Sequence, residues 1–164
     1  MPYRYKVLLI TTSISLVLDQ LSKAYIDQTF KLYQSLVVIE NFFNITYVRN
    51  QGAAFGIFSD SSLRVPFFIG IALLASAVIM WVIHRLKETQ KLFGFGLSLI
   101  FSGAIGNLID RIRLGEVIDF IDVHWYQHHW PAFNVADSAI SVGVALLLLD
   151  MCRDELNKRR AVKQ

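Results

Sequence analysis

Four stretches of this sequence are each apolar over close to the ~20 residues that a helix needs to cross a lipid bilayer. They cover about residues 7–25, 66–84, 92–111 and 136–152. Hydrophobic residues make up 54% of the chain, and its mean hydropathy of +0.46 is high for a soluble domain of this length. The pattern predicts an all-α membrane protein, a bundle of four transmembrane helices that forms one integral membrane domain over residues 1–164.

The first apolar stretch follows a basic start, which is also the pattern of a cleavable signal peptide. A cleavage site would show small residues after the apolar stretch, whereas this chain continues with Asp19, Gln20, Ser22 and Lys23. Three further apolar stretches come later. We therefore expect the first stretch to be retained as a transmembrane helix.

Lysine and arginine residues predict the orientation, because basic residues gather in the cytoplasmic flanks of transmembrane helices. Ten of the sixteen basic residues lie before the first span, between the second and third, or after the fourth. They are Arg4, Lys6, Arg85, Lys87, Lys91, Arg153, Lys158, Arg159, Arg160 and Lys163. Both termini are therefore expected in the cytoplasm, with segments 26–65 and 112–135 facing outward.

The two outward segments differ in character. Residues 36–39 and 42–48 are rich in β-formers and are separated by Glu40 and Asn41, a hairpin-like pattern that predicts a small β-rich extracytoplasmic subdomain. Segment 112–135 carries aromatic residues of the types that favour the headgroup level of a membrane. It is expected to lie along the outer interface.

Composition also restricts the partners. The basic residues are spread over termini and loops, without the dense patch that binds a phosphate backbone, so no nucleic-acid partner is expected. Cys152 is the only cysteine, which excludes an internal disulfide. We expect a monomer surrounded by membrane lipid.

Four aspartates lie near the outward ends of the predicted spans or in the segments beside them: Asp19, Asp110, Asp119 and Asp137. A charge near the hydrocarbon is costly, so such groups normally face a partner or a water-filled cavity. Residues four apart share one face of a helix. This spacing places three of the acids on stripes of small or polar residues, namely Ser15-Asp19-Lys23, Ser98-Ser102-Gly106-Asp110 and Asp137-Ser141-Ala145. The acids are therefore expected to point into the bundle.

A purely structural role is the alternative for these acids, through pairing with Lys23, Arg111 or Arg113. The neighbouring Arg111 favours this alternative for Asp110. Asp137 opens a predicted span, where a carboxylate caps the helix N-terminus, but residues 133–136 also place an amide and backbone groups beside it. This arrangement favours a functional site at Asp137.

Five short motifs occur in order along the chain, and together they resemble the lipoprotein signal peptidases. They are Asp-Gln-Leu-Ser-Lys (19–23), Arg-Asn-Gln-Gly-Ala-Ala-Phe (49–55), Gly-Asn-Leu-Ile-Asp-Arg (106–111), Gly-Glu-Val-Ile-Asp-Phe (115–120) and Phe-Asn-Val-Ala-Asp (133–137). Each motif alone is a weak signal. The ordered set in a four-span chain is specific.

The resemblance implies an aspartyl endopeptidase that removes the signal peptide from a prolipoprotein, cleaving before a cysteine that carries a diacylglyceryl group. It implies no cofactor and no metal, and it implies a location in the inner membrane of a bacterial cell. Asp119 and Asp137 are then the catalytic pair. Asp110 is the competing candidate for the second carboxylate, but we assign it to an ion pair with Arg111.

Two neighbouring carboxyl groups suit such chemistry, because like charges close together cannot both ionise cheaply and the pair retains one proton. The ionised member can accept a proton from water while the protonated member polarises the scissile carbonyl. The resemblance also implies a set of residues that support the carboxylates or line a substrate groove, and a lid over 51–58 is a further expectation. That set is Asp19, Lys23, Asn50, Gly52, Asn107, Asp110, Arg111, Asn134 and Ala136.

Two other functions remain open on the residues alone. A metal-dependent protease is one, since Asp122, His124, His128 and His129 cluster in the outer segment, although the chain has no His-Glu-x-x-His motif. A small ion or proton transporter is the other, since intramembrane acids often mark an ion path. A transporter favours acids at several depths, whereas these acids gather near one face.

Overall fold

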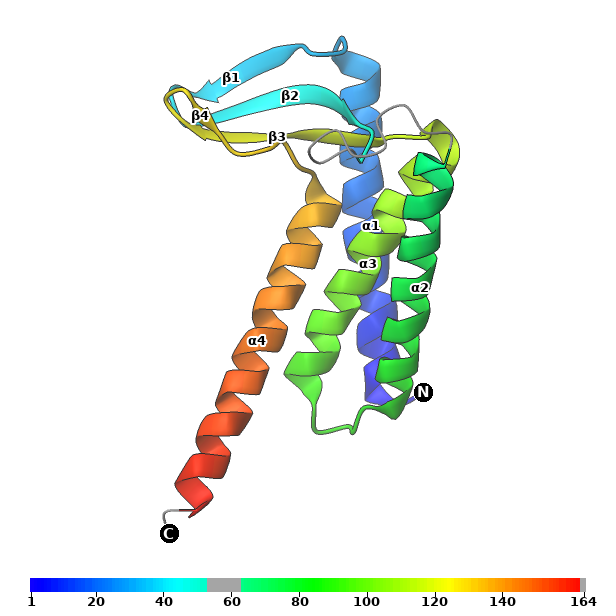
Figure 1. Ribbon diagram of the computed structural model, residues 1–164, viewed down its shortest axis with the longest axis vertical. Helices are drawn as coiled ribbons and strands as arrows, with labels where there is room; N and C mark the ends of the chain where they lie inside the picture. The colour runs from blue at the N-terminus through cyan, green and yellow to red at the C-terminus, as the bar shows by residue number, and fades with distance from the viewer. Residues whose placement is uncertain (53–62, 163–164) are drawn as a thin grey trace.

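The structure is a computed structural model that describes residues 1–52 and 63–162. Four long helices form a bundle, and a four-stranded antiparallel sheet lies across one end of it (Figure 1). The helices are α1 (Tyr3–Thr29), α2 (Arg64–Arg85), α3 (Lys91–Leu114) and α4 (Val135–Val162). Within the described ranges, all four are long and apolar enough to cross a membrane. The predicted helical membrane bundle with a small β-rich subdomain is confirmed.

Each helix contains one of the apolar windows and extends beyond it. The extension is longest in α4, which continues past the window 136–152 to Val162. The added turns are rich in good helix formers, and Arg159 donates to Glu155 one turn earlier at 2.9 Å. The helix therefore continues after its apolar part has ended.

Helix α3 lies between α1, α2 and α4 at the centre of the bundle (Figure 1). Half of its most apolar window is buried, against 17% in each of the other helices. Glycines allow α4 to approach it closely. A Cβ atom on Gly96 would lie 2.9 Å from the carbonyl oxygen of Gly143, and one on Gly103 would overlap the carbonyl oxygen of Ala136. Such contacts between small residues are a common way for helices to pack in lipid.

The sheet has the strand order β1-β2-β3-β4, with β1 (Ser35–Ile39), β2 (Phe43–Asn50), β3 (Val117–Trp125) and β4 (His128–His129). Strands β1 and β2 form the hairpin expected from the sequence, and Asn41 in the turn between them has a positive φ of 58°. Strand β3 belongs to the segment expected only to lie along the interface. It pairs with β2, which brings residues of both segments expected to face outward together in one sheet.

The turn from α3 into β3 helps to position the site. Gly115 ends α3 in the left-handed conformation, with φ of 74°, and its N–H donates to the carbonyl of Arg111 at 3.0 Å. Strand β3 begins two residues later, and Asp119 lies opposite Val48 of β2. Below the sheet, Ile26, Tyr47, Ile118 and Phe120 form a buried apolar cluster that joins the sheet to the end of α1.

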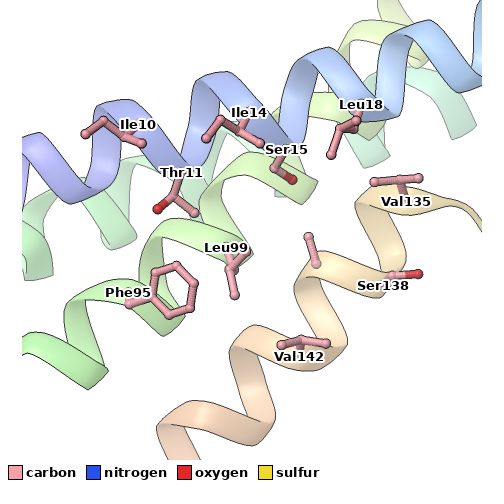
Figure 2. Close-up of a pocket in the computed structure, with 11 residues that line it drawn as sticks. Ile10, Thr11, Ile14, Ser15, Leu18, Phe95, Leu99, Val135, Ser138 and Val142 are labelled. Atoms are coloured by element: carbon pink, nitrogen blue, oxygen red, sulfur yellow. The ribbon is translucent and has the colours of Figure 1, made fainter.

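A groove of about 480 Å³ opens between α1, α3 and α4, and its lining side chains converge from all three helices (Figure 2). The lining is apolar apart from the hydroxyls of Thr11, Ser15 and Ser138. Asp119 and Asp137 do not line it. Val135 and Ser138, which do line it, lie close to Asp137 in the first turn of α4.

Candidate active site

Asp119 and Asp137 come from different elements and meet at one asparagine. Asp119 lies on β3 and is 1% exposed, whereas Asp137 lies in the first turn of α4 and is half-buried. The Nδ2 atom of Asn134 donates to Oδ1 of Asp119 at 2.7 Å. The backbone N–H of Asn134 donates to Oδ2 of Asp137 at 3.3 Å, and the N–H of Asp137 returns a 2.9 Å bond to Oδ1 of Asn134. One residue thus contacts both carboxylates.

Two more asparagines contribute one donor each. Asn50, at the end of β2, donates through Nδ2 to Oδ2 of Asp119 at 2.8 Å. Asn107, on α3, donates through Nδ2 to Oδ1 of Asp137 at 2.7 Å. Each carboxylate therefore accepts bonds from two different asparagines.

The pKa of Asp119 is raised from 3.8 to about 6. Burial is the largest cause, and the charge of Asp137 adds to it. The hydrogen bonds from Asn50 and Asn134 and the charge of Lys23 oppose the rise. A carboxyl with this pKa can carry a proton at a pH where an ordinary aspartate is fully ionised.

A buried ionic cluster lies behind the two carboxylates. The Nζ atom of Lys23 is 2.9 Å from Oδ2 of Asp19, 2.9 Å from Oδ2 of Asp110 and 3.0 Å from Oδ1 of Asn107. Asp19 also accepts a 2.9 Å bond from the backbone N–H of Ala136, which connects the cluster to the start of α4. Asp19, Lys23 and Ala136 are therefore joined in one cluster, which reaches Asp137 through Asn107.

Asp110 pairs with Lys23 and not with Arg111, contrary to the expected ion pair. Adjacent helical residues point in directions about 100° apart, so Asp110 faces α1 while Arg111 faces elsewhere. The Arg111 guanidinium lies 5.1 Å from the ring centre of Phe68 and donates to the carbonyl of Asn107 at 3.3 Å. The Asp110 carboxylate is therefore bonded within the ionic cluster with Lys23.

A polar cavity of about 490 Å³ opens beside Asp119 on the sheet side of the site. Asn50 and Gln51 at the end of β2 line it together with Pro131 and Ala132. Gly52, with φ of 80°, donates its N–H to Oδ1 of Asn50 at 2.7 Å. The cavity gives the Asp119 carboxyl an approach from outside the bundle. Residues 53–58 of the expected lid lie outside the described residues.

The histidines of the outer segment form a separate group at the far end of the sheet. His129 pairs with Asp122 at 2.8 Å, and its ring stacks on that of His124 with 4.5 Å between ring centres. Among the residues that the structure describes, no three His, Cys, Asp or Glu side chains are grouped so that they could hold a metal ion.

The sequence reasoning missed Gln20. Its Nε2 atom donates to Oδ2 of Asp19 and to Oδ1 of Asp110, both at 3.1 Å, so it joins the two acids of the ionic cluster. Its position next to Asp19 in the first motif was the available signal. A side chain one residue from the polar stripe of a helix can still reach a neighbouring helix when it is as long as glutamine.

Comparison with known proteins identifies similar chains over most of the length. The model of the family described as "Signal peptidase (SPase) II" matches residues 11–153. A protein of Geobacter metallireducens named "Lipoprotein signal peptidase" is 59% identical over 151 residues, covering 92% of this chain and 93% of that protein. One of the same name from Pseudomonas aeruginosa is 46% identical, covering 88% and 86%.

Solved structures show the same fold. One described as a bacterial membrane enzyme at 2.3 Å resolution superposes with a TM-score of 0.82 and 35% sequence identity, covering 92% of this chain and 90% of that one. A second, at 1.9 Å resolution, gives a TM-score of 0.81 with the same identity and covers 90% and 93%.

Proposed function

Because the chain belongs to the signal peptidase II family and is a membrane-embedded peptidase, we propose that it cleaves prolipoproteins before the diacylglyceryl-modified cysteine, using Asp119 and Asp137 to activate water. The observation that carries this proposal is the contact of Asn134 with both carboxylates, at 2.7 Å to Asp119 and 3.3 Å to Asp137. Two acids from different elements are thus held by one asparagine, and Asp119 lines a polar cavity.

The proposed reaction is general acid–base hydrolysis without an acyl-enzyme. The pair holds one proton. Its ionised carboxylate takes a proton from water as the water oxygen bonds to the scissile carbonyl carbon. The protonated carboxyl donates to the carbonyl oxygen. When the C–N bond breaks, the protonated carboxyl gives a proton to the leaving nitrogen, and a hydroxyl of the tetrahedral intermediate returns one to the other carboxylate as the carboxyl product forms, so the pair again holds one proton. The protons belong to the pair and not to either residue alone.

The location of the site supports a substrate that is itself anchored in the membrane. The carboxylates lie where the helices meet the sheet, and α1 begins and α4 ends at the opposite end of the bundle (Figure 1). With the basic flanks in the cytoplasm, the sheet and the carboxylates face outward. Trp125 at the end of β3 and Trp130 just after β4 are 67% and 68% exposed, as suits the headgroup level. We propose a monomer in this orientation, in contact with lipid.

The described acids do not favour a transporter. Asp19 and Asp110 both form ion pairs with Lys23. Together with Asp119 and Asp137 they lie near one end of the bundle. An ion path needs polar groups at further depths along the helices. The apolar groove of Figure 2 offers only three hydroxyls over its length.

The proposal predicts that the purified protein in detergent or liposomes cleaves a precursor peptide whose cysteine carries a diacylglyceryl group. Because two carboxyls activate the water, activity is expected to persist in the presence of a strong chelator. The measurement is the mass of the products, which also locates the cleaved bond. Loss of activity with the chelator and its return with added zinc would contradict the aspartyl mechanism.

Activity is expected to fall as pH rises through about 6, because the proton held by the pair is lost there. Asn50 stabilises the ionised form of Asp119, so Asn50→Leu is expected to raise the pKa and move this alkaline limb upward by about half a unit to one unit. The measurement is kcat against pH.

Asn44→Leu is the matched control for the asparagine substitution. Asn44 lies on the same strand and donates to Oδ2 of Asp122 at 2.9 Å, away from the pair. The alkaline limb of the pH profile of Asn44→Leu should coincide with that of the wild type. An alkaline limb that stays in place in Asn50→Leu would show that Asp119 does not determine it.

A further inference from the structure

The three asparagine side chains around the carboxylates are each held in one orientation by a group that can only donate. Oδ1 of Asn50 accepts the backbone N–H of Gly52, and Oδ1 of Asn134 accepts the N–H of Asp137. For Asn107 the donor is the Nζ atom of Lys23, at 3.0 Å. An amide whose oxygen faces a donor must turn its NH₂ group the other way. All three NH₂ groups consequently point at carboxylates.

Lys23 differs from the other two donors because it is a side chain on another helix. Its ammonium group has three hydrogens and no acceptor. Three oxygens lie within hydrogen-bond distance, one each from Asp19, Asp110 and Asn107, at 2.9, 2.9 and 3.0 Å. Lys23 is 2% exposed. Its three hydrogens therefore match three protein acceptors, and the orientation of Asn107 depends on one of them.

We propose that Lys23 is a positioning residue for the reaction, acting through Asn107. It holds Oδ1 of Asn107 so that Nδ2 faces Oδ1 of Asp137, at 2.7 Å, while the same Oδ1 also accepts Nδ2 of Asn134 at 3.2 Å. Without Lys23 only the longer bond from Asn134 holds the Asn107 oxygen, so the amide can rotate more readily and present its oxygen to the Asp137 carboxylate, which repels it. The inference rests on the proposed function, in which Asp137 is one of the reacting carboxyls.

The alternative is that Lys23 only stabilises two buried acids by ion pairing. A structural role of this kind predicts a less stable protein whose folded fraction keeps its kcat. A positioning role predicts that kcat falls while KM stays unchanged, because the NH₂ group of Asn107 acts on the reacting carboxylate and not on the bound peptide.

A double-mutant cycle distinguishes the two roles. Lys23→Met, Asn107→Ala and the double variant are purified in detergent, checked for thermal unfolding, and assayed with the diacylglyceryl precursor peptide. We expect Lys23→Met to lower kcat by roughly 10- to 100-fold, as removal of an orienting partner commonly does, with KM within about twofold of the wild type. In the Asn107→Ala background, Lys23→Met is expected to lower kcat by less than about threefold, since the amide that Lys23 orients is absent.

Lys31→Met is the matched control, since Lys31 is exposed beyond the end of α1, and it should retain the wild-type kcat.

If Lys23→Met does not fold, the double variant Lys23→Met with Asp110→Asn replaces it. This double variant removes one charge of each sign, and its kcat is compared with that of Asp110→Asn alone. Additive effects of the Lys23 and Asn107 substitutions on kcat, or a loss confined to stability, would overturn the positioning role. A wild-type protein that cannot cleave the precursor at all would instead overturn the proposed function.

Discussion

Replacement of Asp137 or Asp119 by asparagine is expected to lower kcat for the lipidated precursor by about 10²- to 10⁴-fold, the range lost when a general acid or base is removed. The reason is that an amide neither accepts a proton from water nor donates one to the leaving nitrogen. Because the two carboxyls act as a unit, the double variant should be little worse than either single variant. The measurement is single-turnover cleavage of the precursor by each variant.

The Asp119 substitution needs a check of folding. Both oxygens of this carboxylate accept N–H donors, from Asn134 and Asn50, so an amide at position 119 places one NH₂ group against another. Thermal unfolding in detergent separates this effect from the loss of chemistry. The Asp137→Asn variant tests the proposed chemistry independently of this effect on folding.

Asp122→Asn is the matched control for the pair. Asp122 lies three residues further along β3 and accepts bonds from His129 and Asn44 at the far end of the sheet. The Asp122→Asn variant should cleave the precursor at close to the wild-type rate. Activity that survives in Asp119→Asn but is lost in Asp110→Asn would transfer the second catalytic role to Asp110 and would contradict the assignment made here.

The second large effect is expected at the crossing of α3 and α4. Gly103→Ala places a Cβ atom onto the carbonyl oxygen of Ala136 and 2.7 Å from Cγ1 of Ile140. Backbone cannot move aside as a flexible side chain can, so we expect a loss of roughly 1–3 kcal/mol in the free energy of unfolding. Displacement of Ala136 also moves the adjacent Asp137, and a shift of about 1 Å at a reacting group can cost about 10²-fold in rate. Unfolding in detergent and kcat are the two measurements.

Gly70→Ala is the control for that substitution, since it is the same change in another transmembrane helix. A Cβ atom on Gly70 meets nothing within 4 Å. Alanine is favoured over glycine inside a helix by about 0.5–1 kcal/mol, so this variant should be as stable as the wild type or slightly more stable. Equal stability of the two alanine variants would show that α3 and α4 are not closely packed at Gly103.

The spans and the hairpin could be predicted from the sequence because they depend on local properties. Apolar stretches of sufficient length predict helices in lipid, and β-formers on either side of Glu40 and Asn41 predict paired strands. The motifs led to the family in the same way, since they are residue types at fixed spacings. Strand β3 was not predicted as a strand, because its partner β2 lies more than sixty residues away in the chain.

The partners of the polar side chains were decided by the tertiary structure. Proximity along the chain favoured Asp110 with Arg111, but the packing of α1 against α3 places Lys23 2.9 Å from Asp110 instead. The same packing turns the Asn107 amide toward Asp137. A sequence specifies which groups can donate or accept, whereas the pairing of those groups depends on distances and angles of about an ångström and a few tens of degrees, which only the packed helices and sheet determine.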